Sequence, residues 1–202
     1  VFGSAMALKQ RHFKRRLAYS TVSNLSYILF AAAVMTPAGE LAAFLHLIVH
    51  SVVKIMAFFC AGSVLHYAHR EYVSELEGLG KRMPLTFACF TAAACALTGI
   101  PPFNGFVSKW YIGLAAVGEG SVASYLGFVA ILISALLTAI YMFQVVVKAW
   151  FPAEGTELPT PESAHEAGPF MIVPMLILAA LCLLMGLFPE VLLDVIGKAV
   201  ML

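Results

Sequence analysis

The amino-acid sequence predicts an all-α membrane protein with about five transmembrane helices, the third of them broken. Two properties of the composition support this fold class: 61% of the 202 residues are hydrophobic and only 11% are charged, and the mean hydropathy is +0.92. Soluble domains carry about a quarter of charged residues. A third observation is that the apolar residues gather in segments of about 20 residues, the length that crosses a hydrocarbon layer of about 30 Å.

Five apolar segments reach this length, and polar connections separate them. Residues 1–16 form a basic connector ahead of the first segment, and residues 190–202 form a C-terminal tail. The predicted spans, which together make a bundle over residues 17–189, are 17–36, 41–66, 84–117, 122–147 and 169–189.

The third segment is too long for one simple span and contains GIPPFNGF in its middle. Proline removes a backbone donor and clashes with the preceding helical turn, so two consecutive prolines flanked by glycines interrupt a helix. We therefore expect a break between about Leu97 and Phe106. The residues of the predicted break are Gly99, Pro101, Pro102 and Gly105.

The basic residues predict how the chain crosses the membrane. The connector ahead of the first span, the connection after the second and the loop 148–168 all carry Lys or Arg, whereas the alternate connections TPAGE and GEGS carry none. By the positive-inside rule, the N-terminal end of the chain lies in the cytoplasm. After five crossings the C-terminus, with Lys198, lies outside.

Four ionisable side chains remain within the predicted spans: His46, His50, Lys54 and Lys109. All eleven acidic residues lie in connections, at span ends or beyond the last span, so no carboxylate within the spans pairs with these four. An ionisable group inside a membrane is costly, and it usually faces the bundle interior or water on a route for ions or protons.

His46, His50 and Lys54 recur at four-residue intervals, which places them along one face of a helix over about 12 Å. Histidine titrates near neutral pH, so this spacing favours a proton-transfer route. A lone membrane histidine is more often a hydrogen-bonded core residue, and a lone lysine near a span end extends to the interface. Three such residues in register, with an apolar run after Lys54, favour the route. A metal site is not indicated, because no third ligand accompanies the histidines.

Lys109 follows the predicted break, where its ammonium can meet free carbonyls and water. Broken spans occur in lipid where the exposed backbone is buried in protein or lines a hydrated cavity, and transporters use such breaks as ion sites. The alternative is a plain connector between two helices, with Lys109 at an interface. Tyr19, Tyr27 and Trp110 are expected at membrane interfaces rather than in a hydrated pocket.

Other chemistries find no support in the sequence. The net charge of +1 does not indicate a nucleic-acid partner. The four cysteines form no CxxC pair or Cys/His cluster, so we expect buried free thiols. There is no flavin or nicotinamide fingerprint and no iron–sulfur cysteine run, so no cofactor is expected.

Several of these stretches together resemble a known family. HLIVHSVVKIMAFFCAGSVL followed by GIPPFNGFVSKWYI, with RRLAYSTVSNLSYI upstream and LEGLGKRMP between, is similar to the proton-translocating antiporter-like subunits of respiratory complex I. The same superfamily includes subunits of Mrp-type cation/proton antiporters and of energy-converting membrane hydrogenases. The resemblance covers residues 8 to about 150 well and the final span loosely.

The resemblance implies both a fold and roles for residues. A full subunit of that family has about fourteen spans, built as two inverted repeats of five helices. This chain is then expected to be half of an inverted-repeat antiporter-like fold, with the N-terminal repeat missing. The resemblance further implies that His46, His50 and Lys54 lie on a central axis, and that Lys109 ends the outlet channel.

The function expected from the resemblance is translocation of protons, or of another cation such as sodium, in a bacterial or archaeal cytoplasmic membrane. The chain would be a non-redox subunit of a translocase such as NADH:quinone oxidoreductase or a membrane hydrogenase. Its expected partners are other membrane subunits, the missing repeat and the lipid bilayer. Two alternatives stay open: a scaffold subunit of such a complex, and a cation/proton antiporter subunit without redox coupling.

Overall fold

The computed structural model describes residues 1–153, 160 and 163–200, and this part of the chain is helical, as predicted. Residues 154–159 and 161–162 of the loop 148–168, and residues 201–202 of the predicted tail, lie outside the described residues. The described helices are α1 (Phe2–Lys9), α2 (Phe13–Ala33), α3 (Pro37–Ala68), the 3₁₀ turns η1 (Val73–Leu76) and η2 (Leu79–Lys81), α4 (Pro84–Thr98), α5 (Asn104–Glu119), α6 (Val122–Trp150), α7 (Pro169–Leu187) and α8 (Pro189–Val200).

The predicted break in the third apolar segment is confirmed. Helix α4 ends at Thr98 and helix α5 begins at Asn104, so the segment forms two helices rather than one. Three helices, α3, α6 and α7, are long and apolar enough to cross a membrane by length and composition, and α4 is a shorter apolar helix.

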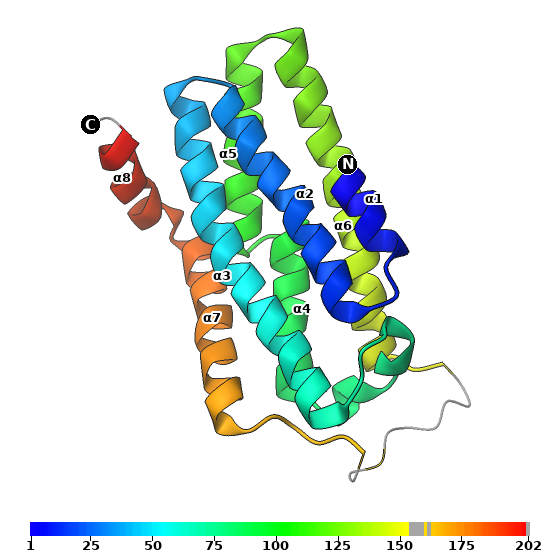
Figure 1. The fold of residues 1–202 in the computed structure, drawn as a ribbon. Coiled ribbons are helices and arrows are strands. Elements are labelled where there is room, and N and C mark those ends of the chain that lie inside the picture. The colour runs from blue at the N-terminus through cyan, green and yellow to red at the C-terminus, as the bar shows by residue number, and fades with distance from the viewer. Residues whose placement is uncertain (154–159, 161–162, 201–202) are drawn as a thin grey trace.

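Helix α3 lies at the centre of the bundle and is its longest element (Figure 1). It packs against α2, α4, α5, α7 and α8. Its start is well defined, because Pro37 occupies the first turn and the Thr36 side chain accepts a hydrogen bond of 3.1 Å from the Gly39 backbone N–H. Its end has His69 in the left-handed conformation, at φ 51°.

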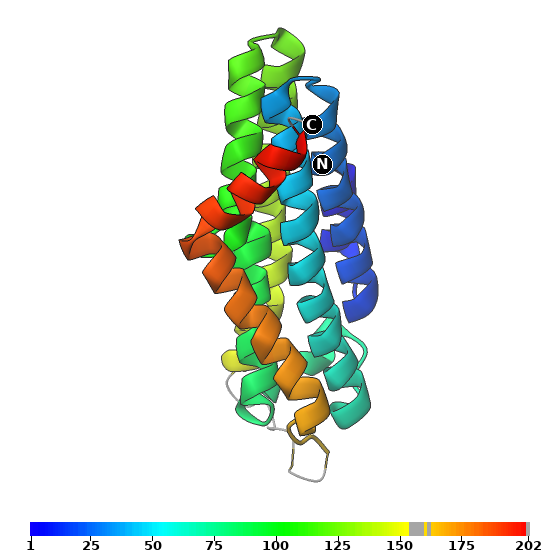
Figure 2. The same cartoon turned by 90° about the vertical axis from the view of Figure 1, so that its left-hand side faces the viewer.

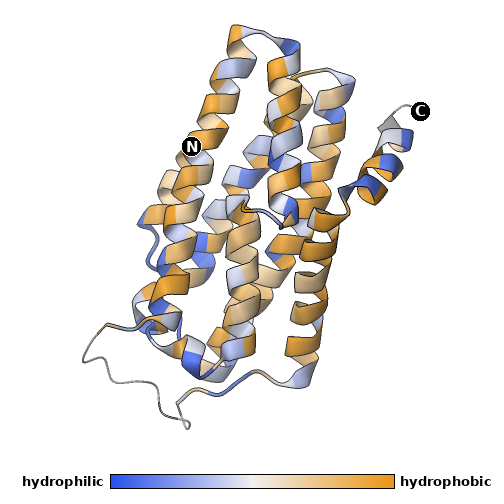
Figure 3. Ribbon diagram, turned by 180° about the vertical axis from the view of Figure 1, so that it is seen from behind, coloured by the Kyte–Doolittle hydropathy of each residue, from blue (hydrophilic) through white to orange (hydrophobic). Residues whose placement is uncertain are grey.

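Apolar side chains cover much of the outside of the bundle. Hydrophobic colour dominates the long helices in Figure 3. In water such a surface would be unfavourable, whereas a hydrocarbon layer solvates it. Large exposed apolar side chains on α2, α6 and α7 include Leu29, Leu126, Leu132, Leu136, Ile177 and Leu184.

Polar connections meet at one end of the bundle. Lys148, at the end of α6, forms an ion pair of 2.5 Å with Glu77 in the connection between α3 and α4. His12 and Tyr72 form an isolated antiparallel bridge that joins this connection to the α1–α2 turn. Backbone N–H groups of Glu71 and Tyr72 donate to the exposed Glu75 carboxylate and lower its pKa. The basic connections identified from the sequence therefore lie on the same side of the bundle.

Two terminal segments contain helices that the sequence pattern did not indicate. The connector predicted at 1–16 includes helix α1 and the first turn of α2. The described part of the predicted tail forms helix α8, which turns away from the direction of α7 (Figure 2) and packs against α3. Ile196 is the buried anchor of α8.

Candidate functional site

The candidate site is the interior face of α3, which carries His46, His50 and Lys54. Their four-residue spacing brings all three onto the side of α3 that packs in the bundle, and their exposed fractions are 2%, 6% and 5%. A buried polar group without a partner destabilises a fold, so the partners of each side chain indicate what the site can do.

Lys54 is held by helix α2. Its Nζ donates to the backbone carbonyl of Leu17 at 3.1 Å and to the Ser20 hydroxyl at 2.7 Å. Both partners are neutral acceptors, and no salt bridge to Lys54 is formed in the described part of the chain. The ammonium is therefore hydrogen-bonded but not neutralised.

His46 is held by helix α5, and this contact indicates its tautomer. Its Nδ1 lies 2.9 Å from the Ser108 hydroxyl, which donates its proton to the Gly105 carbonyl at 3.2 Å. Because Ser108 then accepts from His46, the network assigns the proton of the neutral imidazole to Nδ1. The opposite nitrogen, Nε2, carries a lone pair and can accept a proton.

The two histidine rings stack at a centroid distance of 6.2 Å. The Nε2 atoms of both His46 and His50 are buried without a hydrogen-bond partner among the described residues. Buried polar atoms of this kind are usually satisfied by ordered water. The two rings are thus placed so that water can connect them.

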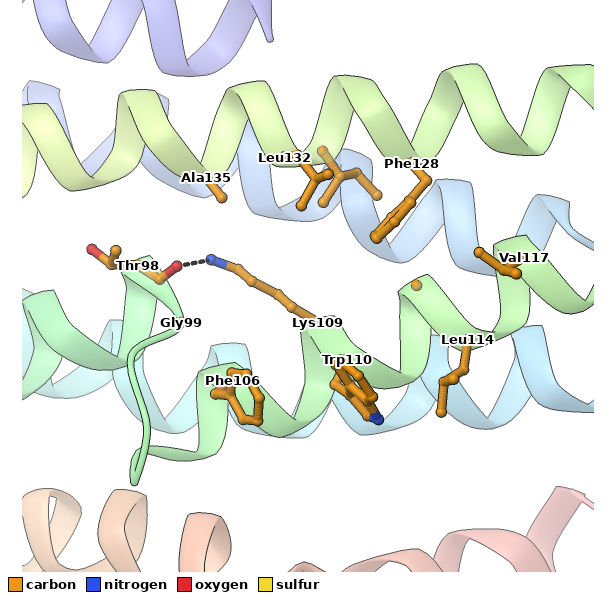
Figure 4. A pocket seen from close by; sticks show the side chains of 12 residues that line it. Thr98, Gly99, Phe106, Lys109, Trp110, Leu114, Val117, Phe128, Leu132 and Ala135 are labelled. Atoms are coloured by element: carbon orange, nitrogen blue, oxygen red, sulfur yellow. Dashed lines mark hydrogen bonds between the residues drawn. The ribbon is translucent and has the colours of Figure 1, made fainter.

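Lys109 caps the broken end of α4 (Figure 4). Its Nζ donates to the carbonyls of Leu97 at 2.5 Å and of Thr98 at 2.8 Å. The last carbonyls of a helix lack intrahelical partners and carry the negative end of its dipole. The break therefore creates the acceptor site that holds the Lys109 ammonium.

Two glycines of the predicted break have separate roles. Gly99 follows α4 in the left-handed conformation, at φ 93°, which a glycine adopts without strain. Gly105 lies so close to the Ala96 carbonyl that a side chain would overlap it. Gly186 on α7 packs equally closely against the Pro102 carbonyl. The two ends of the break are therefore packed tightly by backbone.

An apolar cavity of about 460 Å³ lies between α5 and α6, with the Lys109 side chain extended along one wall (Figure 4). Thr98 lines the same end, and within the described part of the chain its buried hydroxyl has no hydrogen-bond partner. The rest of the wall is apolar and includes Phe106, Trp110, Leu114, Val117, Phe128 and Leu132.

Tyr27 brings the two parts of the site together. Its ring lies 5.6 Å from the His46 ring and 5.8 Å from Lys109 Nζ. It is 2% exposed, and its buried hydroxyl has no hydrogen-bond partner among the residues that the structure describes. The expectation that Tyr27 lies at an interface is therefore wrong within this bundle, because His46 and Lys109 pack against its ring.

A set of buried hydroxyl groups and one buried arginine were not predicted from the sequence. Ser4, Ser23 and Ser134 form a closed triangle of hydrogen bonds that joins α1, α2 and α6. Arg16, expected in the basic connector, is a buried residue of α2. Its guanidinium donates to the carbonyls of Gln10 and Tyr141 and to the Gln144 side chain.

Helical spacing is the sequence signal that could have indicated the hydroxyl groups, although it does not show which helix faces them. Polar residues of α2 recur at the intervals expected for one helix face, and those of α6 do the same. The residues in question are Ser20, Ser23, Asn24 and Tyr27 on α2, and Ser134, Thr138 and Tyr141 on α6.

In the described residues, no three His, Cys, Asp or Glu side chains come together in a way that could hold a metal ion. The four cysteines are free thiols, of which Cys60, Cys89 and Cys182 are buried. What the site offers is a row of proton-binding groups with neutral partners.

The sequence of this chain is similar to a protein-family model and to a curated relative. Residues 1–138 match the model of the family described as NADH:quinone oxidoreductase/Mrp antiporter, TM. The chain is 40% identical over 200 residues to NADH-quinone oxidoreductase subunit N of Desulforudis audaxviator (strain MP104C), which covers 94% of this chain and 39% of that protein.

The fold of this chain is also similar to that of chains in solved membrane complexes. A chain in the structure of the Mrp complex from Dietzia sp. DQ12-45-1b is 25% identical with a TM-score of 0.85, over 99% of this chain and 44% of that chain. A chain in the membrane-bound sulfane sulfur reductase, an archaeal respiratory membrane complex, is 33% identical with a TM-score of 0.86, over 99% of this chain and 39% of that one. The chain thus spans about two fifths of the length of these relatives.

Proposed function

Because the chain belongs to the NADH:quinone oxidoreductase/Mrp antiporter transmembrane family, we propose that it carries protons through the membrane along α3 to Lys109. The route runs from Lys54 past His50 and His46. It then passes the Tyr27 ring to the ammonium at the end of α4.

One observation carries this proposal: His46 on α3 and Lys109 on α5 both lie against Tyr27. The row on α3 is thereby continued by a residue that is 55 positions or more away in sequence from its members. Buried, unpartnered nitrogen and oxygen atoms on His50, His46 and Tyr27 mark where water would complete the path.

The chemistry of each group suits its place. The lone pair on His46 Nε2 can take a proton while Nδ1 stays bonded to Ser108. Lys54 and Lys109 can each lose a proton without leaving a carboxylate unpaired, because their partners are hydroxyl and carbonyl oxygens. A row of this kind passes charge by changes of protonation rather than by movement of helices.

The proposal includes a topology and partners. Five crossings by α2, α3, the α4–α5 pair, α6 and α7 would put the basic connections in the cytoplasm of a bacterium or archaeon and the C-terminus outside. The named relatives belong to complexes with electron or cation chemistry, so we assign the driving reaction to other subunits. The relatives are longer than this chain, and we assign the other half of the path to the part of such a subunit that this chain does not cover.

A cation/proton antiporter subunit is the second candidate. The similarity to a chain of the Mrp complex favours it, and the same proton-binding row would serve either complex. A scaffold role, in which the row is idle, is the third reading of the same geometry.

Loss of Lys54 tests the proposal. In the assembled complex, proton uptake into inside-out vesicles should fall to the background level in Lys54→Ala, because the row loses its first member. Assembly should persist, since deleting a buried charge also removes its desolvation cost. The driving force is the complex's own electron donor or, for an antiporter, an imposed sodium gradient.

Lys81→Ala is the matched control, because Lys81 is an exposed lysine in the α3–α4 connection. It should transport protons as the unmodified complex does. Normal proton uptake in Lys54→Ala would rule out the route and leave the scaffold role.

A further inference from the structure

A chain of buried hydroxyl groups leads from Lys54 through Ser20 on α2 to Tyr141 and Thr138 on α6. Ser20 Oγ lies 2.7 Å from Lys54 Nζ and 2.7 Å from Tyr141 Oη, which lies 3.1 Å from Thr138 Oγ1. The Thr138 hydroxyl donates to the Ser134 carbonyl at 2.8 Å. The three hydroxyl residues are each at most 1% exposed, so bulk water does not compete for these contacts.

The number of protons restricts how this chain can be oriented. Each hydroxyl has one proton to donate, and the carbonyl at the far end can only accept. When Lys54 is an ammonium and donates to Ser20, the hydroxyl protons of the chain are all used within it if Ser20 donates to Tyr141 and Tyr141 donates to Thr138. Every hydrogen bond then points away from the charge, an arrangement that stabilises it.

The orientation can reverse when Lys54 is neutral. Its nitrogen then has a lone pair, to which the Ser20 hydroxyl can donate, and Tyr141 can donate to Ser20. Thr138 stays bonded to the Ser134 carbonyl in both states. Only two protons turn, on Ser20 and Tyr141, and each hydroxyl keeps its proton throughout.

We propose that Ser20, Tyr141 and Thr138 are positioning residues for Lys54, forming a hydrogen-bond chain that reverses each time Lys54 gains or releases its proton. This inference rests on the proton route proposed above and adds residues of α2 and α6 to it. In this chain, Thr138 acts only on the charged state, because it receives the Tyr141 proton in that state alone.

The other groups around Lys54 do not replace the chain. His50 faces it along α3, and Arg16 on α2 lies behind Tyr141, bonded to its backbone carbonyl. A protonated histidine and a charged arginine have hydrogen-bond donors but no acceptor, so in their charged forms neither His50 nor Arg16 can accept a hydrogen bond from the Lys54 ammonium. From α2, the Leu17 carbonyl is the remaining partner. The Ser20 hydroxyl is therefore the one contact of Lys54, among those of the described residues, that can both accept and donate.

The test compares pH profiles of proton uptake by the assembled complex in inside-out vesicles. Thr138→Val removes the hydroxyl at constant shape, and Thr138→Ser keeps it. Thr138→Val and Tyr141→Phe destabilise the charged state by about one hydrogen bond, so the alkaline limb of the profile should move to lower pH by roughly half to one unit. Thr138→Ser should keep the limb in place.

Controls separate this inference from the proposed route. Ser26→Ala, which removes an exposed hydroxyl from α2, should leave the profile unchanged. Two results would overturn the hydrogen-bond chain: an alkaline limb that does not move in Thr138→Val and Tyr141→Phe, or an equal shift in Thr138→Ser and Thr138→Val. The proposed route would still stand if Lys54→Ala loses proton uptake. If Tyr141→Phe fails to assemble, the two Thr138 variants decide the matter. Normal uptake in Lys54→Ala would remove both proposals.

Discussion

Single residues in the bundle interior are held by partners that do not fix their charge. Lys54 is bonded to a carbonyl and a hydroxyl, and Lys109 to two carbonyls at the end of α4. A carboxylate at the same place would favour the ammonium strongly and resist its deprotonation. Oxygen atoms without charge hold the side chain in position and leave its proton exchangeable.

The two histidines should matter less than Lys54. We expect proton uptake in His46→Ala and in His50→Ala to fall between that of Lys54→Ala and that of the unmodified complex. Water can occupy the space of one imidazole and bond to the groups on either side, whereas nothing replaces the lysine charge. Rates of dye quenching in inside-out vesicles give the ranking. Uptake as low in either histidine variant as in Lys54→Ala would contradict a water-bridged path.

The charged members of the site could be predicted from the sequence, and the hydroxyl members could not. Lys54 and Lys109 are conspicuous because a charge inside an apolar segment is costly. A serine or tyrosine in a membrane helix costs much less, and its importance depends on which helix faces it. Ser20 and Tyr141 are 121 positions apart, and only the packing of α2 against α6 brings them together.

The pair of helices α4 and α5 determines where Lys109 lies in the site. The chain leaves α4 through Gly99, turns at the two prolines and enters α5 at Asn104. This turn exposes the Leu97 and Thr98 carbonyls, and Lys109, one turn into α5, reaches back to them. The break was predictable from the prolines. That Lys109 caps the end of α4 was not, because this contact depends on α5 packing beside α4 in the folded chain.

Gly105 and Gly118 offer a matched pair of substitutions on α5. Gly105→Ala should destabilise the assembled complex by about 1–3 kcal/mol, because the new methyl group would overlap the Ala96 carbonyl. Gly118→Ala should be neutral or stabilising by about 0.5–1 kcal/mol, since its site is open and alanine favours a helix.

Thermal unfolding of the detergent-solubilised complex gives the comparison. A midpoint for Gly105→Ala equal to that of Gly118→Ala would show that α4 and α5 do not meet as closely as the structure has them. Proton uptake in Gly105→Ala should fall with the loss of the assembled complex.

Helices α3, α6 and α7 were predictable because long apolar runs leave few other solutions in a membrane. Helix α1 was not, because its eight residues are too few to show a span pattern. Helix α8 has an apolar stripe, but only the structure shows that this stripe packs on the bundle, with Ile196 buried.

Across the whole molecule, charge is separated by position. The described basic connections gather at one end of the bundle, whereas the interior row runs from Lys54 at mid-length of α3 toward the break. This arrangement suits a path that takes charge through the centre of the membrane rather than along its surface. The chain spans about two fifths of the length of its relatives.

Proton uptake by the assembled complex with Lys109→Met tests whether the proposed route ends at Lys109. Methionine has a similar length and no charge, so the fold should persist while the end of the path is lost. Lys81→Met, the same change at an exposed lysine, is the control. We expect background uptake in Lys109→Met and normal uptake in Lys81→Met, at equal amounts of assembled complex. Normal uptake in Lys109→Met would contradict the route and leave Lys109 as a helix cap alone.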